Sequence, residues 1–170
     1  MYCGMLGRET LQHQKKRKCY FVTVPVRQQL QEVLQRDDML QKIGTSHISL
    51  TVNTAGVPLY NSSSVNLWPI FFIINNLPTS EIFIQQHLII WGLWQGCGNP
   101  CFKTYLQLLV NELNGLHLEG FDVNNQNFKA TMICYTMDLQ AKSQVMEMVQ
   151  HNGQYGCILT RVKATARVIQ

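Results

Sequence analysis

The pattern of hydrophobic and polar residues is most regular between residues 48 and 54, where it predicts a strand. Apolar side chains stand at Ile48, Leu50 and Val52 with polar ones between them, which is the period of a strand with one buried face. Gly56 follows and permits a turn. The chain is therefore expected to reverse direction here and to begin a second strand.

Two more strands are predicted between this turn and the proline at position 78. The first is short and ends at the polar run of residues 61–64. The second, Trp68–Ile74, is almost entirely apolar, which is typical of a strand buried on both faces. Turn-forming residues in Asn75-Asn76-Leu77-Pro78 end it. Residues 48–78 thus predict three strands side by side, around which the rest of the chain is arranged.

The flanking segments predict helices and one further strand. Leucines at positions 106, 109, 113 and 116 recur at helical spacing, which makes this the clearest helix in the chain. The same criteria predict a strand at Tyr20–Pro25, an amphipathic helix at Val26–Gln41, a helix start or turn at Ser80–Phe83, an apolar run at His87–Leu93, a glycine-rich loop over residues 92–100, a helix at Phe102–Leu118, a turn at Gly120–Asn127, a strand at Phe128–Tyr135 and a helix at Leu139–Gln150.

Composition favours one domain. The chain has 170 residues, of which 46% are hydrophobic, enough to bury a core, and only 14% are charged. The net charge of +4 is compatible with a polyanionic partner but does not require one. No signal peptide is recognisable, and the longest apolar runs are too short to span a bilayer. We therefore expect a nuclear or cytoplasmic protein that is not secreted and has no membrane partner.

The six cysteines are expected to be reduced thiols, because the predicted compartment is reducing. A structural zinc site needs four ligands, whereas Cys3 and Cys19 with His13 supply three. Cys97 and Cys101 form a single pair in the predicted loop, with no second pair close by. We expect no metal site, and a zinc knuckle built from these cysteines is the alternative.

Several short motifs, taken together, carry a resemblance to a known family. In the first half they are Thr54-Ala55-Gly56-Val57, Ser62-Ser63-Ser64, Leu67-Trp68-Pro69 and Asn75-Asn76-Leu77-Pro78. In the second half they are Gly92-Leu93-Trp94, Lys103, Val110-Asn111-Glu112-Leu113, Thr136-Met137-Asp138, Ala141 and Asn152-Gly153-Gln154-Tyr155-Gly156-Cys157. In this order and spacing the chain, from about Tyr20 to Cys157, resembles the transposases of CACTA-type (En/Spm-like) DNA transposons, which are DDE enzymes.

The resemblance implies a mixed α/β fold, an RNase H-like DDE transposase core that is incomplete at its C-terminus. Residues 48–54 and 129–135 would then be adjacent central strands whose ends meet at the metal site. The implied organisation is a basic tail at 1–19 that retains part of a cysteine-rich segment, a strand and helix at 20–47, the truncated core at 48–157 and an unrelated basic tail at 158–170.

The resemblance also implies that the catalytic chemistry has been lost. DDE enzymes hold two divalent ions between carboxylates for displacement at phosphorus. Family members carry the first acid where this chain has Ala55, and Asp138 matches the second. The residues alone predict Asp138 to be a helix N-cap, and both roles are compatible. The third acid lies beyond the family's last matching motif, so we expect an inactive protein that has lost the ancestral Mg²⁺ or Mn²⁺.

Three functions remain open from the sequence. The first is a catalytically inactive transposase relic that self-associates through apolar surface at Met146, Val149 and a loop at Trp91–Trp94. The second is a weak, non-specific DNA-binding module that uses basic residues, namely Lys15, Lys16, Arg17, Lys18, Lys103, Lys129, Arg161 and Lys163. The third, ranked last, is a metal-dependent nuclease that combines Asp138 with one of three other acids, namely Glu112, Glu119 or Asp122.

Overall fold

The computed structural model describes residues 19–36, 38–60 and 64–148 of the chain. The chain divides into two compact units, Met1–Thr136 and Met137–Gln170. The first unit contains a β-sheet with helices packed on it, and the described part of the second contains one helix. The predicted mixed α/β class is confirmed.

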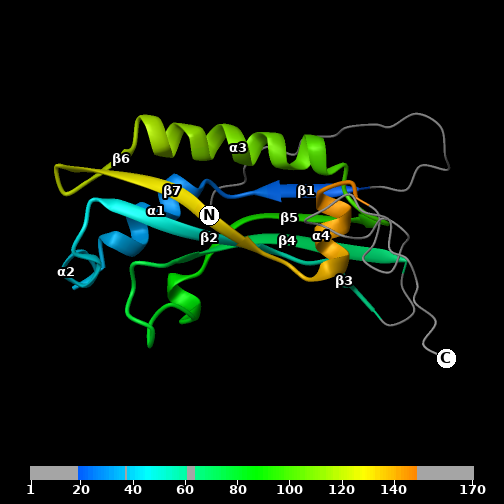
Figure 1. The fold of residues 1–170 in the computed structure, drawn as a ribbon, viewed down its shortest axis with the longest axis horizontal. Coiled ribbons are helices and arrows are strands. Elements are labelled where there is room, and N and C mark those ends of the chain that lie inside the picture. The colour runs from blue at the N-terminus through cyan, green and yellow to red at the C-terminus, as the bar shows by residue number, and fades with distance from the viewer. Residues whose placement is uncertain (1–18, 37, 61–63, 149–170) are drawn as a thin grey trace, which may run out of the picture. The chain divides into compact units, whose positions relative to one another are not determined.

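The sheet of the first unit has seven strands in the order β1-β5-β4-β2-β7-β6, and β3 pairs with β4 (Figure 1). Their bounds are β1 Tyr20–Thr23, β2 His47–Thr54, β3 Val57–Pro58, β4 Val65–Ile74, β5 Ile89–Cys97, β6 Phe121–Val123 and β7 Gln126–Thr136. Strand β2 is antiparallel to β4 and parallel to β7. The expectation that residues 48–54 and 129–135 form adjacent strands is therefore confirmed.

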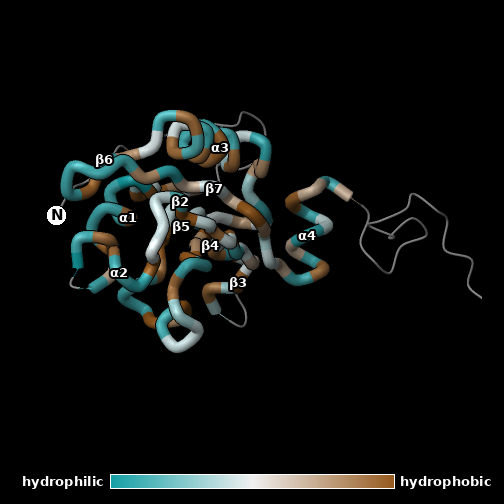
Figure 2. Tube along the Cα trace, turned by 60° about the vertical axis from the view of Figure 1, so that its left-hand side comes forward, coloured by the Kyte–Doolittle hydropathy of each residue, from teal (hydrophilic) through white to brown (hydrophobic). Residues whose placement is uncertain are grey.

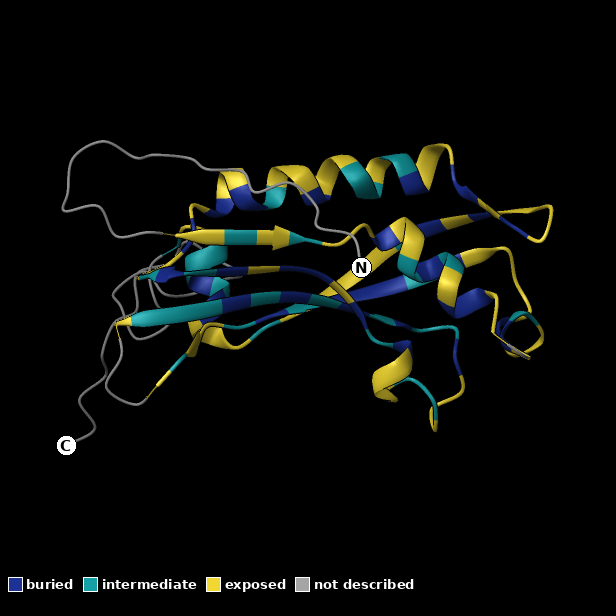
Figure 3. Cartoon of the chain, turned by 180° about the vertical axis from the view of Figure 1, so that it is seen from behind, coloured by how far each residue is buried: buried dark blue, intermediate teal, exposed yellow. Residues whose placement is uncertain are grey.

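Helices α1 and α3 form the layer that packs on this sheet. The helical elements are α1 Val26–Leu34, α2 Met39–Ile43, the 3-10 turn η1 Gln85–His87, α3 Phe102–Leu118 and, in the second unit, α4 Leu139–Val145. The α3 helix runs along the sheet, where its Phe102 and Tyr105 contact Trp68 of β4 (Figure 1). Buried residues occur along α1, α3 and the central strands (Figure 3).

The core follows the hydrophobic pattern of β2 and β4. Hydrophobic residues are concentrated in the central strands (Figure 2). In β2, Ile48, Leu50 and Val52 are buried as predicted. In β4 every second residue from Trp68 to Ile74 is buried, whereas the residues between them are only half-buried. One face of β4 is therefore buried and the other is only half-buried, so the prediction that this strand is buried on both faces is wrong.

The predicted helix at Val26–Gln41 is two helices rather than one. The first ends at Leu34, and Asp38, which precedes the second, has a φ of 66°. This left-handed conformation cannot continue an α-helix and is tolerated by aspartate better than by most residues. Met39 and Ile43 of α2 are buried like the apolar residues of α1. The helical spacing of apolar residues therefore continues across the break and does not reveal it.

The predicted loop over residues 92–100 is wrong for residues 92–97, because β5 extends to Cys97. Its glycines misled the prediction, since in this strand a glycine is required for packing. A Cβ on Gly96 would lie 2.6 Å from the Trp94 ring. Glycine therefore allows the indole to lie against the strand backbone. Trp91 and Trp94 belong to this strand and are only 1% and 8% exposed. The expected exposed aromatic loop at Trp91–Trp94 therefore does not exist.

The predicted turn at Gly120–Asn127 is a β-hairpin formed by β6 and the start of β7. Asn124 and Asn125 have φ values of 50° and 63°, which is the two-residue turn that favours asparagine. Strand β7 therefore begins at Gln126, two residues before the predicted start. The strand itself was predicted, but the short partner that precedes it was not.

In the second unit, α4 ends at Val145, before the predicted end at Gln150. Glu147 has a φ of 52°, which stops a helix. Met146 is 41% exposed, as expected, and Val149 lies outside the described residues. No helix in the described part of the chain is long and apolar enough to cross a membrane.

Candidate functional site

The candidate site begins where the parallel strands β2 and β7 end side by side. Asn53 is the register partner of Thr136, and its side-chain Nδ2 donates a hydrogen bond of 2.9 Å to Thr136 Oγ1. Ala55 follows Asn53 by two residues. The adjacent ends of two parallel strands are a common place for groups that must act together.

The residues around Ala55 are occupied by packing and backbone contacts. The hydroxyl of Thr54 is buried and donates a hydrogen bond of 2.8 Å to the carbonyl oxygen of Pro69. Gly56 lies under the indole of Trp68, so a Cβ there would come within 2.6 Å of the ring. Thr54 and Asn53, which precede Ala55 in the sequence, offer a hydroxyl that is already hydrogen-bonded and a neutral amide, and both are weaker ligands for Mg²⁺ than carboxylates.

Asp138 belongs to the second unit, where it is the N-cap of α4. Its Oδ1 accepts a hydrogen bond of 2.6 Å from the backbone N–H of Ala141. The capping role predicted from the residues is confirmed, and it is a role that aspartate often has at helix starts. The cap uses one carboxylate oxygen.

A protein-family comparison matches most of the chain. Residues 31–167 match the family described as protein of unknown function, DUF1258. The chain belongs to this family. The DUF1258 match includes β2, β7 and α4, and therefore both Ala55 and Asp138. No curated protein matches the chain.

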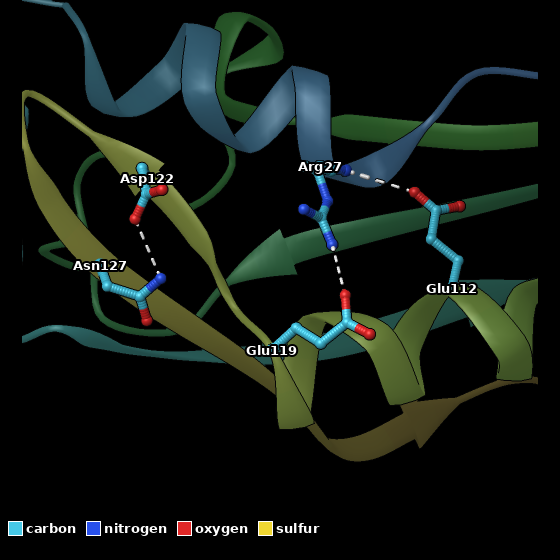
Figure 4. A network of polar contacts seen from close by, with 5 residues as sticks. All are labelled: Arg27, Glu112, Glu119, Asp122 and Asn127. Carbon is cyan, nitrogen blue, oxygen red and sulfur yellow. Dashed lines mark hydrogen bonds and ion pairs between the residues drawn. The ribbon is translucent and has the colours of Figure 1, made fainter.

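The three other acids considered for a nuclease all have partners in the first unit: Glu112 and Glu119 both contact Arg27, and Asp122 contacts Asn127 (Figure 4). Glu112 of α3 accepts hydrogen bonds from the backbone of α1 and from Trp91. Glu119 lies 3.9 Å from Arg27, and Asp122 accepts a hydrogen bond of 3.0 Å from Asn127. Among the residues that the structure describes, no three His, Cys, Asp or Glu side chains are placed to hold one metal ion.

Glu112 has a role that the sequence did not suggest. Its Oε1 lies 2.5 Å from the backbone nitrogen of Val26 and 3.3 Å from that of Arg27, and its Oε2 lies 2.9 Å from Trp91 Nε1. Because Pro25 has no side chain that can cap α1, this carboxylate from another helix satisfies the first N–H groups. The signal that could have revealed it is a proline at the helix start with no capping residue before it.

The basic residues do not form one patch in the described part of the chain. Lys103 and Lys129 are both exposed. Lys103 lies in the first turn of α3, whereas Lys129 is two residues from Thr131, which contacts His117 in the last turn. A helix rises 1.5 Å per residue, so about 20 Å of α3 separates them. Lys15, Lys16, Arg17, Lys18, Arg161 and Lys163 lie outside the described residues.

The cysteines proposed for a zinc knuckle are only partly described. Cys97 Sγ lies 3.6 Å from Ser64 Oγ, and Cys101 Sγ lies 3.5 Å from Thr104 Oγ1. Cys19 precedes β1, and Cys3 and His13 lie outside the described residues. Cys134 of β7 is exposed.

Proposed function

We propose that this chain is a catalytically inactive relative of the DDE transposases that retains an RNase H-like core. The observation that carries the proposal is the parallel pairing of β2 with β7, with Ala55 placed just after β2. In the resembling family the first metal-binding acid occupies this position. An alanine methyl group cannot hold a metal ion, so the proposal excludes two-metal phosphoryl transfer.

The order of strands supports an RNase H-like core. Strands β2, β4 and β5 follow one another as antiparallel neighbours, and α3 then leads through the β6 hairpin to β7 on the other side of β2. The implied fold has the same arrangement of three antiparallel strands, a helix and a strand parallel to the first. In the first unit β1 extends this sheet beyond β5.

Restoring the missing acid tests the proposal. If position 55 is the ancestral position of the first metal-binding acid, Ala55→Asp restores at the end of β2 a carboxylate that a divalent ion can bind. Mn²⁺ that binds only the folded state would then stabilise it by about 2.7 kcal/mol at 100 times Kd. For a chain of this size, that corresponds to a rise in Tm of about 5–10 °C.

The matched control is Ala55→Asn, which has nearly the same shape without the charge. In thermal melts, millimolar Mn²⁺ should raise the Tm of Ala55→Asp. It should leave the Tm of the unaltered chain and of Ala55→Asn unchanged. Equal metal-induced shifts in the aspartate and asparagine variants would refute the proposed ligand position. Cleavage of DNA should be absent in the unaltered chain and in Ala55→Asn, which lack the first acid.

A further inference from the structure

Two histidines that are distant in the sequence share one hydroxyl group in the first unit. Thr131 Oγ1 of β7 lies 2.9 Å from His47 Nε2 at the start of β2 and 2.9 Å from His117 Nδ1 in the last turn of α3. The two imidazole rings are 6.5 Å apart and nearly perpendicular. Three elements of the fold therefore bring two imidazoles to one point.

The shared hydroxyl limits which of the two facing nitrogens can accept a hydrogen bond. A threonine hydroxyl donates one hydrogen bond, so it can donate to one imidazole nitrogen and accept from the N–H of the other. At most one of the two facing nitrogens can accept from the hydroxyl, so at least one of them carries an N–H in this arrangement, and metal binding requires that nitrogen to release its proton or its ring to change tautomer. Both histidine side chains are exposed, so an ion from solvent can reach them.

We propose that His47 and His117 form a binding site for a divalent transition metal, with Zn²⁺, Ni²⁺ and Cu²⁺ as the fitting ions. Neutral imidazole is a preferred ligand of these metals, whereas Mg²⁺ and Ca²⁺ prefer oxygen. The facing nitrogens can be no farther apart than twice their 2.9 Å distance to Thr131 Oγ1. Two nitrogens bound to one tetrahedral zinc are about 3.3 Å apart, so small rotations of the exposed rings are sufficient.

The surroundings set the expected strength of the site. Lys129 is the register partner of His47, and its positive charge opposes the binding of a cation. Glu119, two residues after His117, is paired with Arg27 at 3.9 Å. With two imidazoles as ligands, water completes the coordination sphere. The site is therefore open, and binding is weaker than at a closed four-ligand zinc site.

This site is independent of the proposed transposase ancestry. His47 begins β2, whereas Ala55 follows the end of the same strand. A strand rises about 3.3 Å per residue, so roughly 25 Å separates the two positions. The metal bound by the histidines would also differ in kind from the Mg²⁺ or Mn²⁺ of DDE chemistry.

The direct test is a titration of the full chain with Zn²⁺, observed in the side-chain imidazole nitrogen NMR signals. At one equivalent, His47 Nε2 and His117 Nδ1 should shift together, and Mg²⁺ should shift neither. Binding measured by calorimetry should weaken at least about tenfold in His47→Ala and in His117→Gln. The double variant gives the background binding of the other three histidines and the six cysteines.

A third variant separates metal binding from a structural hydrogen bond. Thr131→Val removes the hydroxyl that competes for the imidazoles, so it should bind Zn²⁺ at least as tightly as the unaltered chain. If the three residues had only a structural role, all variants would lower the Tm in EDTA and Zn²⁺ would raise none of them. Unmoved His47 and His117 signals in the unaltered chain at saturating Zn²⁺ would overturn the proposal, even if a variant failed to fold.

Discussion

Replacing Glu112 by glutamine should destabilise the first unit strongly, although the side chain keeps its shape. The Glu112 carboxylate accepts hydrogen bonds from the backbone of α1 through one oxygen (Figure 4). Its other oxygen accepts a hydrogen bond from Trp91 Nε1. A glutamine amide has one acceptor oxygen and one NH₂ donor. Its NH₂ group must then face either the indole N–H or the start of α1, and one donor loses its partner.

The magnitude follows from the burial of these partners. Val26 is fully buried and Trp91 is 1% exposed, so neither N–H can turn to water. An unsatisfied buried donor costs about 1–3 kcal/mol, and a lost negative charge at a helix N-terminus costs about 0.3–1 kcal/mol. We expect Glu112→Gln to lower the free energy of unfolding by about 2–3 kcal/mol, which is a fall in Tm of about 4–12 °C.

Glu119→Gln is the matched control, because it makes the same chemical change at the end of the same helix. The Glu119 side chain is 78% exposed, and its oxygen lies 3.9 Å from Arg27. An exposed pair of this kind contributes less than about 1 kcal/mol. Urea unfolding followed by tryptophan fluorescence reports on the first unit, which contains all three tryptophans. Equal losses of stability in the two variants would refute the capping role of Glu112.

Two further predictions concern Tyr105 and Gly56. Burial raises the pKa of the Tyr105 phenol well above its usual range, so the stability that this group contributes is complete below the ordinary tyrosine pKa of about 10 and is lost as pH rises beyond it. Tyr105→Phe loses the 2.8 Å hydrogen bond to the Trp68 carbonyl, which costs about 1 kcal/mol. Above pH 10 the urea midpoint of this variant should fall less steeply than that of the unaltered chain. Parallel curves of midpoint against pH would show that Tyr105 does not cause the loss of stability. Gly56→Ala should lower the free energy of unfolding by about 1–3 kcal/mol, because the added Cβ would overlap the Trp68 ring. The displaced indole should also shift the tryptophan fluorescence. Gly115→Ala, where a Cβ meets nothing closer than 3.9 Å in a helix, should instead stabilise by up to about 1 kcal/mol, and the same sign in both glycine variants would contradict the packing argument.

The sequence predicted those elements whose pattern repeats over several residues. The alternation of β2 and the leucine spacing of α3 both gave elements close to the observed bounds. The prediction failed where tertiary contacts decide the local structure. The glycines of β5 indicated a loop until the Trp94 ring beside Gly96 gave them a packing reason. The break at Asp38 left the apolar spacing of Val26–Gln41 unchanged, so periodicity could not reveal it.

Side-chain partners were the least predictable part of the site. Glu112 stands in one of the motifs on which the resemblance rests and was considered as a metal ligand, yet its contacts are with α1 and Trp91. The partners are 86 and 21 residues away in the sequence. His47, His117 and Thr131 likewise belong to no motif, and the topology of the sheet and α3 alone brings them together. The spacing of residues along the chain cannot predict such contacts.

The motifs that carry the resemblance act in this structure mainly as structural contacts. Thr54 bonds the carbonyl of Pro69, and Gly56 makes room for Trp68. Asn76 accepts a hydrogen bond of 2.7 Å from the backbone N–H of Ser49, which fixes the turn after β4 against β2. These contacts stabilise the sheet whether or not a metal is bound. If the proposed ancestry is correct, selection for folding alone would keep these residues after Ala55 replaced the acid, so the resemblance carries information about the fold and none about present activity.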